Sequence, residues 1–197
     1  MPVVIAGLIL SFLVMALFGD SALDRALLLL LDGRGLPNLG QAAALIHWCA
    51  QPLPLLALIV AGAALLLVWR RWRDALLLGG IAVAGWLLVL AARSLTLPLR
   101  PVSSVSPVAG AAYPDMSAAL ATIAAFTLAF LLTRQARARG WALAGAALFA
   151  SAVGVAAIVA ASAWPSGVVG GWALGLAWTL TALLIARADI GDGTPSR

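Results

Sequence analysis

The chain has 197 residues, of which 64% are hydrophobic and 10% are charged, and its mean hydropathy is +1.09. Soluble domains carry about 25% charged residues, so this composition excludes a soluble globular protein and indicates an integral membrane protein. All 12 basic side chains are arginine, and the formal net charge is +5. In a membrane protein such residues first indicate orientation, and we expect no nucleic acid partner.

Six hydrophobic runs reach or approach the roughly 20 apolar residues that a transmembrane helix needs. The fold class that we predict is therefore an all-α bundle with spans near residues 2–18, 53–69, 75–92, 117–133, 141–161 and 168–186. The first run lacks a basic start and a small-residue cleavage site, which favours a retained span over a signal peptide. Residues 1–188 would form one membrane domain, followed by a polar tail at 189–197.

The segment between the first two predicted spans, residues 19–52, is mixed in character. Its sequence predicts one short helix that begins near Ser21 and ends before Gly33, and a second helix from Asn38 to Ala50. Both are too short to cross a membrane comfortably, so we expect them to lie in or near the interface.

The arginines cluster after the second and fourth predicted spans. Because positive charge favours the cytoplasmic side, these loops and both termini are predicted to be cytoplasmic in a bacterial inner membrane. Three other segments would then share the extracytoplasmic face: residues 19–52, 93–115 and 162–167.

Metal and cofactor chemistry is not expected. The chain has one histidine, His47, one cysteine, Cys49, and no glutamate. A zinc or iron site normally needs several such side chains, and a single cysteine cannot form an intrachain disulfide.

Polar motifs interrupt the hydrophobic pattern before the fourth and sixth predicted spans. The first is Arg93-x6-Arg100-Pro101, the second is Tyr113-Pro114-Asp115-Met116-Ser117, and a third run extends from Ser162 to Trp172. In order and spacing they resemble the K-x6-R-P, F/Y-P-S-G-H and H-W-P-S-D-V-x-G-G-W motifs of the type-2 phosphatidic-acid phosphatase and haloperoxidase superfamily. The resemblance covers essentially the whole chain and implies a six-helix bundle of the lipid-phosphatase type, with an interfacial helical segment after the first span.

The resemblance also assigns roles to individual positions. In that superfamily one histidine attacks phosphorus, a second protonates the leaving alcohol, an aspartate orients the nucleophile, and basic side chains hold the phosphate. Here Arg93 and Arg100 correspond to phosphate-binding residues. The other positions lack the group that the family uses. Ala163 stands at the nucleophile position and Gly167 at that of the orienting aspartate. Ser117 stands at the position of the acid and Ala157 at that of the third-motif arginine.

Asp115 and Ser117 admit two interpretations. At a spacing of two residues they do not share a helix face, so Asp115 is expected to cap the following helix rather than activate Ser117. Asp115 could also pair with Arg93 or Arg100. The two arginines have an alternative role as well, because arginine at the end of a span can anchor the helix at the headgroups.

Without a histidine in the motifs, a covalent phosphohistidine route is closed, and serine is no general acid near neutral pH. The leading hypothesis is a catalytically degenerate homologue that binds a phosphorylated lipid or polyprenyl-phosphate headgroup, or acts as an accessory subunit of a membrane protein partner. One alternative is an active lipid phosphatase rebuilt around Ser117, Asp115 and His47. A small lipid transporter and a purely structural subunit are further alternatives.

Glycines in the last two predicted spans are expected to allow close helix packing rather than to line a channel. They are Gly145, Gly154, Gly170, Gly171 and Gly175.

Overall fold

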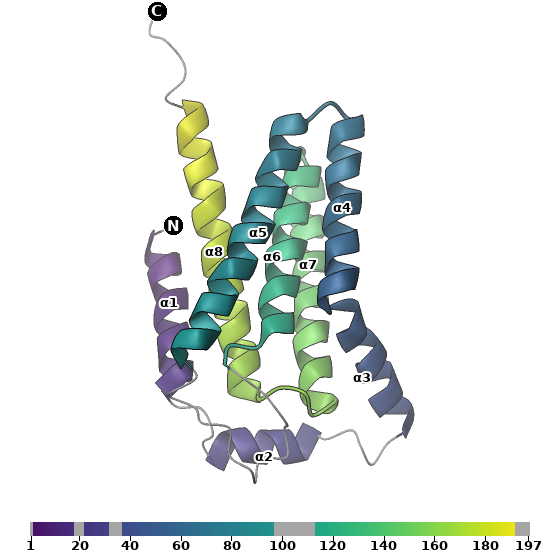
Figure 1. Ribbon diagram of the computed structural model, residues 1–197, viewed down its shortest axis with the longest axis vertical. Helices are drawn as coiled ribbons and strands as arrows, with labels where there is room; N and C mark the ends of the chain where they lie inside the picture. The colour runs from purple at the N-terminus through teal and green to yellow at the C-terminus, as the bar shows by residue number, and fades with distance from the viewer. Residues whose placement is uncertain (1, 18–21, 32–36, 97–112, 192–197) are drawn as a thin grey trace, which may run out of the picture.

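The computed structural model describes residues 2–17, 22–31, 37–96 and 113–191. Within these ranges the secondary structure is helical, with eight helices and no strand (Figure 1). In chain order the helices are α1 (Pro2–Leu17), α2 (Ala22–Leu31), α3 (Pro37–Cys49), α4 (Pro52–Val68), α5 (Trp72–Thr96), α6 (Met116–Leu132), α7 (Ala136–Val159) and α8 (Pro165–Gly191).

Each predicted span corresponds to one of these helices, and α4 to α8 run side by side as a bundle (Figure 1). By length and composition, three helices can cross a membrane alone: α5, α7 and residues 165–186 of α8. The pairs α1–α2 and α3–α4 are each bent by more than 40°, and if each pair is one span the total rises to five, whereas α6 is a shorter apolar helix. The helical bundle is confirmed, and the count of six crossings stays a prediction.

Helix α6 forms the centre of the bundle because nearly every side chain along it is buried. It is rich in alanine, and these small side chains let α5, α7 and α8 approach its backbone closely. Ile123 of α6 packs in a core cluster with Leu66 of α4 and with Leu78 and Val89 of α5, all of them 1% exposed or less. The core of the bundle therefore forms around α6.

The two short helices predicted between the first spans are present as α2 and α3. Helix α2 lies across one end of the bundle, where it contacts α7 and α8 (Figure 1). Helix α3 packs against α7 and continues into α4 with a bend of 51°. At the C-terminus, α8 reaches Gly191 and so extends past residue 189, where the polar tail was predicted to begin.

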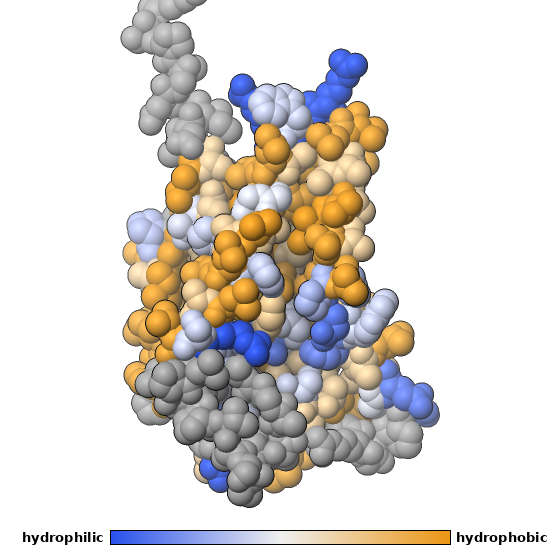
Figure 2. Space-filling model, viewed as in Figure 1, coloured by the Kyte–Doolittle hydropathy of each residue, from blue (hydrophilic) through white to orange (hydrophobic). Residues whose placement is uncertain are grey.

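The flank of the bundle is hydrophobic. Large apolar side chains such as Leu53, Leu76 and Leu148 are 67–78% exposed, and Figure 2 shows hydrophobic residues along most of the visible flank. A surface of this extent and polarity needs an apolar environment. The chain is an integral membrane protein.

Glycines permit the closest helix contacts. A Cβ atom added at Gly171 of α8 would lie 2.7 Å from the carbonyl oxygen of Asp115, and one at Gly175 would lie 2.8 Å from that of Ala119. Gly170 is confined by the ring of Tyr113, which lies outside the helices. Gly154 is enclosed by Trp172 and Val168 of α8, so close helix packing is confirmed at Gly154, Gly171 and Gly175. It is wrong for Gly145, which has no other atom within 4 Å of an added Cβ.

We expect Gly171→Ala to lower the free energy of unfolding by about 2 kcal/mol, because the new methyl group forces α6 and α8 apart. Gly145→Ala is the matched control, since it adds the same group on a helix where no neighbour is displaced, and it should leave stability unchanged or raise it by up to about 1 kcal/mol, because alanine is the better helix former. Reversible unfolding in mixed detergent micelles measures both. Equal losses in the two variants would contradict the packing role of Gly171.

Candidate functional site

The motif segments meet at the end of the bundle that α2 crosses. The backbone N–H of Asp115 donates a hydrogen bond to the carbonyl oxygen of Gly167 at 2.9 Å, which joins the second motif to the third. The hydroxyl of Thr96, in the last turn of α5, donates to the carbonyl oxygen of Tyr113. The prediction that these segments share one face is therefore confirmed for the part of each segment that the structure describes.

Arg93 is half-buried and lies three residues before the end of α5. Neither Asp24 nor Asp115 forms a described ion pair or hydrogen bond with it, so within the described ranges its guanidinium is left for another acceptor. Arg100 and Pro101 lie outside the described residues. Of the phosphate-binding pair predicted from the sequence, the structure therefore places Arg93 alone, and phosphate binding by the pair stays a prediction.

Asp115 caps α6 as predicted, because its carboxylate accepts the backbone N–H of Ala118 at 2.7 Å. The same oxygen also accepts the hydroxyl of Ser117 at 2.6 Å. The spacing argument missed this second contact because Asp115 is outside the helix, in an extended conformation that brings its side chain back over the first turn. The alternative pairing of Asp115 with Arg93 does not occur. Pro114, the residue before Asp115, is fully buried.

The position that corresponds to the nucleophile is enclosed by apolar side chains. Ala163 is 2% exposed, Ala157 is 0% exposed, and both belong with Leu28 of α2 to one cluster of buried apolar residues. The backbone N–H of Ala163 donates to the carbonyl oxygen of Ala157 at 3.2 Å. The residue from which an imidazole would have to project is therefore buried in an apolar cluster to which α2 contributes Leu28.

Gly167, at the position of the orienting aspartate, is less confined. A Cβ atom added there would meet only ordinary van der Waals contacts, the nearest 3.8 Å away at the backbone nitrogen of Asp115. The two empty positions thus differ, because the site could accept a side chain at Gly167 but leaves little room for one at Ala163.

A contact that the sequence did not reveal ties α2 to the third motif. Asp24 is 4% exposed, and its carboxylate accepts the backbone N–H of Ser166 at 2.9 Å and the Ser166 hydroxyl at 2.5 Å. Ser166 is the second residue of α8, where backbone N–H groups have no acceptor within the helix and the helix dipole favours negative charge. The only sequence signal for this contact is an acidic residue in the apolar helix at 22–31.

His47 does not join the proposed rebuilt site in the described part of the chain. Its Nε2 lies 3.0 Å from the side-chain nitrogen of Gln51, one turn further along the chain, and its Nδ1 is buried without a partner. No described hydrogen bond connects it to Asp115 or Ser117. The structure therefore brings together two of the three residues of that alternative.

Among the described residues of the site, the Arg93 guanidinium has no ion-pair partner, whereas the carboxylates of Asp24 and Asp115 both accept hydrogen bonds. Asp24 occupies the N-terminal end of α8 and Asp115 that of α6, and both helix ends are positions that favour anions. A phosphate that reached either helix end would have to displace a carboxylate of the chain itself. Arg93 is the described group that can bind a phosphate oxygen without such a displacement.

The chain matches no protein-family model, and no curated protein is similar to it in sequence. Its structure is similar to the crystal structure of the first transmembrane PAP2 type phosphatidylglycerolphosphate phosphatase from Bacillus subtilis. The TM-score is 0.81 with 20% sequence identity, and the alignment covers 93% of this chain and 96% of that one. The fold implied by the sequence motifs is confirmed: this chain has the fold of a transmembrane PAP2-type phosphatase.

Proposed function

We propose that the chain is a catalytically degenerate member of the lipid-phosphatase superfamily, which binds a phosphorylated lipid or polyprenyl-phosphate headgroup, or acts as an accessory subunit. The observation that carries this proposal is the burial of Ala163 in an apolar cluster with Leu28 and Ala157. A site whose nucleophile position holds an alanine buried among apolar side chains lacks the reacting half of the machinery.

The chemistry of the remaining groups supports the absence of turnover. Ser117 is hydrogen-bonded to a carboxylate, but a serine nucleophile normally needs a base such as histidine to take its proton. Members of a catalytic unit act together, so removal of the nucleophile alone costs several orders of magnitude in rate. A binding function needs only charge and donors, and Arg93 supplies both.

The binding role rests on Arg93 and Arg100. A guanidinium can hold phosphate or carboxylate oxygens through two parallel hydrogen bonds, and Arg93 has no described acceptor of its own. A bundle in the membrane would present these arginines to the headgroup of a lipid. The proposal includes a bacterial inner membrane with the motif end outside, which the arginine clusters at the opposite end favour.

We expect the purified protein to release no phosphate from vesicles that contain phosphatidic acid or phosphatidylglycerolphosphate, with or without metal ions. It should bind these vesicles, and Arg93→Ala should weaken binding about tenfold, because a charge-assisted hydrogen bond is worth about 1.5–3 kcal/mol. Arg137→Ala, which removes a charge at the other end of the bundle, is the matched control. Metal-independent phosphate release that Arg100→Ala abolishes would overturn the proposal.

Mass spectrometry of the gently extracted protein distinguishes the accessory-subunit form of the proposal from the lipid-binding form. A co-purified anionic lipid supports the lipid-binding form. A stoichiometric protein partner, together with unchanged vesicle binding in Arg93→Ala, supports the subunit form.

One observation favours a second candidate, an active hydrolase with a serine nucleophile. The hydroxyl of Ser117 donates to Asp115 at 2.6 Å, and the hydroxyl of Ser166 donates to Asp24 at 2.5 Å. If either carboxylate activates its serine, a fluorophosphonate probe should label that residue, and the corresponding Ser→Ala variant should abolish labelling. Absence of label on both serines removes this candidate.

A further inference from the structure

A cluster of arginines lies at the end of the bundle opposite the motifs, where α4 joins α5 and α6 joins α7. Among the side chains that the structure describes, this end has one acidic residue, Asp74, against six basic residues, Arg70, Arg71, Arg73, Arg134, Arg137 and Arg139. Such an excess of positive charge favours an anionic partner. Positive charge by itself only orients the protein, so the geometry of the donors decides whether a site exists.

The two loops enclose an open hollow of about 440 Å³. Its polar lining comes from Arg71 at the start of α5 and from Thr133, Arg134 and Gln135 between α6 and α7, and Trp69 forms part of the apolar lining. This volume is large enough for a phosphate-bearing headgroup.

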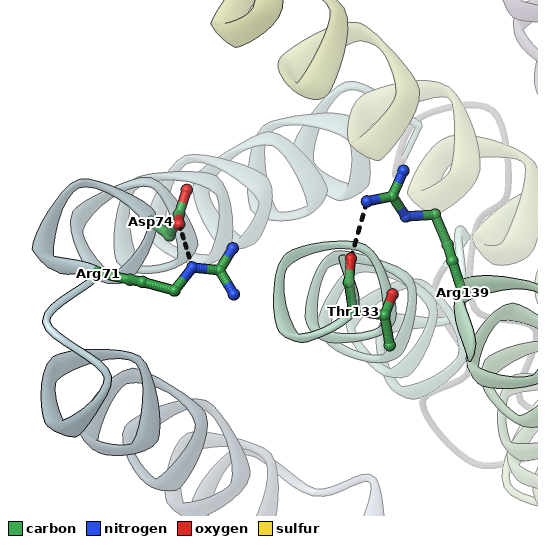
Figure 3. A network of polar contacts seen from close by, with 4 residues as sticks. All are labelled: Arg71, Asp74, Thr133 and Arg139. Carbon is green, nitrogen blue, oxygen red and sulfur yellow. Dashed lines mark hydrogen bonds and ion pairs between the residues drawn. The ribbon is translucent and has the colours of Figure 1, made fainter. Parts of the chain in front are cut away.

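Arg71 is oriented toward the hollow by the turn that precedes it. Arg70 has a left-handed backbone with a φ of 56°, and the N–H groups of Arg70 and Arg71 donate to the carbonyl oxygens of Leu67 and Leu66 at the end of α4. The Nε of Arg71 donates to Asp74 at 2.7 Å. Its two terminal nitrogens point away from Asp74 toward Thr133 (Figure 3).

Across the hollow from Arg71, Arg139 holds the loop between α6 and α7 in place and Arg134 is an unused donor. Arg139 donates one terminal nitrogen to the carbonyl oxygen of Thr133 at 2.8 Å, and its guanidinium lies over the ring of Phe130, with the carbon 4.5 Å from the ring centroid. Its Nε is buried without a partner. Arg134 is exposed, and no described residue accepts a hydrogen bond from it.

The N-terminus of α7 points into the same region. Its cap residue, Gln135, makes no side-chain capping bond, so the first N–H groups of the helix lack an acceptor there. A helix N-terminus of this kind favours an anion, and in this place it is combined with two arginine side chains, Arg71 and Arg134.

We propose that this hollow binds the phosphate of an anionic phospholipid headgroup, held by Arg71 and Arg134 with the N-terminus of α7. A lipid is favoured over free phosphate because tryptophans mark the headgroup level at this end. Trp69, Trp72 and Trp141 are 49%, 56% and 75% exposed, as is typical of residues at a membrane–water interface. The site is at the opposite end of the bundle from Arg93 and does not depend on the proposed function.

The test uses the full-length protein in detergent micelles titrated with phosphatidylglycerol, with phosphatidylcholine of the same acyl chains, or with inorganic phosphate. Binding is followed by native mass spectrometry and by the thermal unfolding midpoint. Arg134→Gln is the informative variant and Arg137→Gln is the control, because both side chains are exposed near the start of α7 but Arg137 does not line the hollow.

We expect phosphatidylglycerol to bind the wild type and Arg137→Gln equally and Arg134→Gln about fivefold more weakly, with the unfolding midpoints of the lipid-free proteins unchanged. Lipid bound at the motif end contributes equally to all three proteins. Equal weakening in both variants would reduce the site to diffuse surface charge and overturn the proposal. Equal binding of phosphatidylcholine, or full competition by inorganic phosphate, would overturn it as well.

Discussion

Replacement of Asp24 by alanine is expected to lower the free energy of unfolding by about 2–3 kcal/mol. The carboxylate accepts two hydrogen bonds from Ser166 in a region where both residues are buried. A hydrogen bond to a charged group contributes about 1.5–3 kcal/mol to the free energy of unfolding. A buried donor left without its acceptor lowers that free energy further, because it stays desolvated without a hydrogen bond. The loss should also release α2 from the end of α8, because this contact joins residues that are 142 positions apart.

Asp74→Ala is the matched control for this prediction. It removes a carboxylate that forms one ion pair, with Arg71, at 2.7 Å, in which the Arg71 and Asp74 side chains are 14% and 32% exposed. A partly exposed pair with a single hydrogen bond should contribute about 1 kcal/mol. Asp24→Asn should give an intermediate loss, since one amide oxygen can still accept from Ser166. Unfolding in mixed micelles measures all three variants, and a loss at Asp24 no larger than at Asp74 would contradict the structural role of the contact.

Local patterns predicted the helices well because hydrophobic runs and short-range capping depend on neighbours in the sequence. The run at 117–133 became α6, and Asp115 was assigned as its cap from position alone. Gly171 and Gly175 were assigned to close packing because small residues in an apolar helix have few other uses. Gly145 fits the same pattern and has no such contact, since the pattern cannot tell which face of α7 meets a neighbour.

Contacts between residues far apart in the chain could not be predicted from the sequence. Nothing in the run at 22–31 indicates that Asp24 accepts from Ser166 or that Leu28 joins a buried cluster with Ala163, because such contacts are set by how α2 crosses the bundle. The motifs did predict which segments meet, and the hydrogen bond between Asp115 and Gly167 confirms it. Asp24 and Leu28 come from a helix that carries no motif.

Restoring the missing nucleophile with Ala163→His is expected to lower the free energy of unfolding by about 3 kcal/mol or more and to produce no phosphatase activity. Ala163 is 2% exposed and Leu28, 3% exposed, packs in the same cluster. An imidazole there overfills the core, at a cost of about 1–3 kcal/mol. It also buries polar nitrogens among apolar neighbours, at a further cost of about 1–3 kcal/mol. Unfolding in mixed micelles and release of phosphate from lipid vesicles are the two measurements.

The combination of Ala163→His with Leu28→Ala separates loss of space from loss of chemistry. If Leu28 occupies the volume that the imidazole needs, the double variant should be more stable than the sum of the single losses predicts, by about 1 kcal/mol or more. Ala136→His, on an exposed residue at the start of α7, controls for the imidazole itself. Strict additivity would mean that Leu28 does not fill the site. A stable Ala163→His protein that hydrolyses lipid phosphate would show that the pocket had kept its polar form, and the degenerate function proposed for this chain would then be wrong.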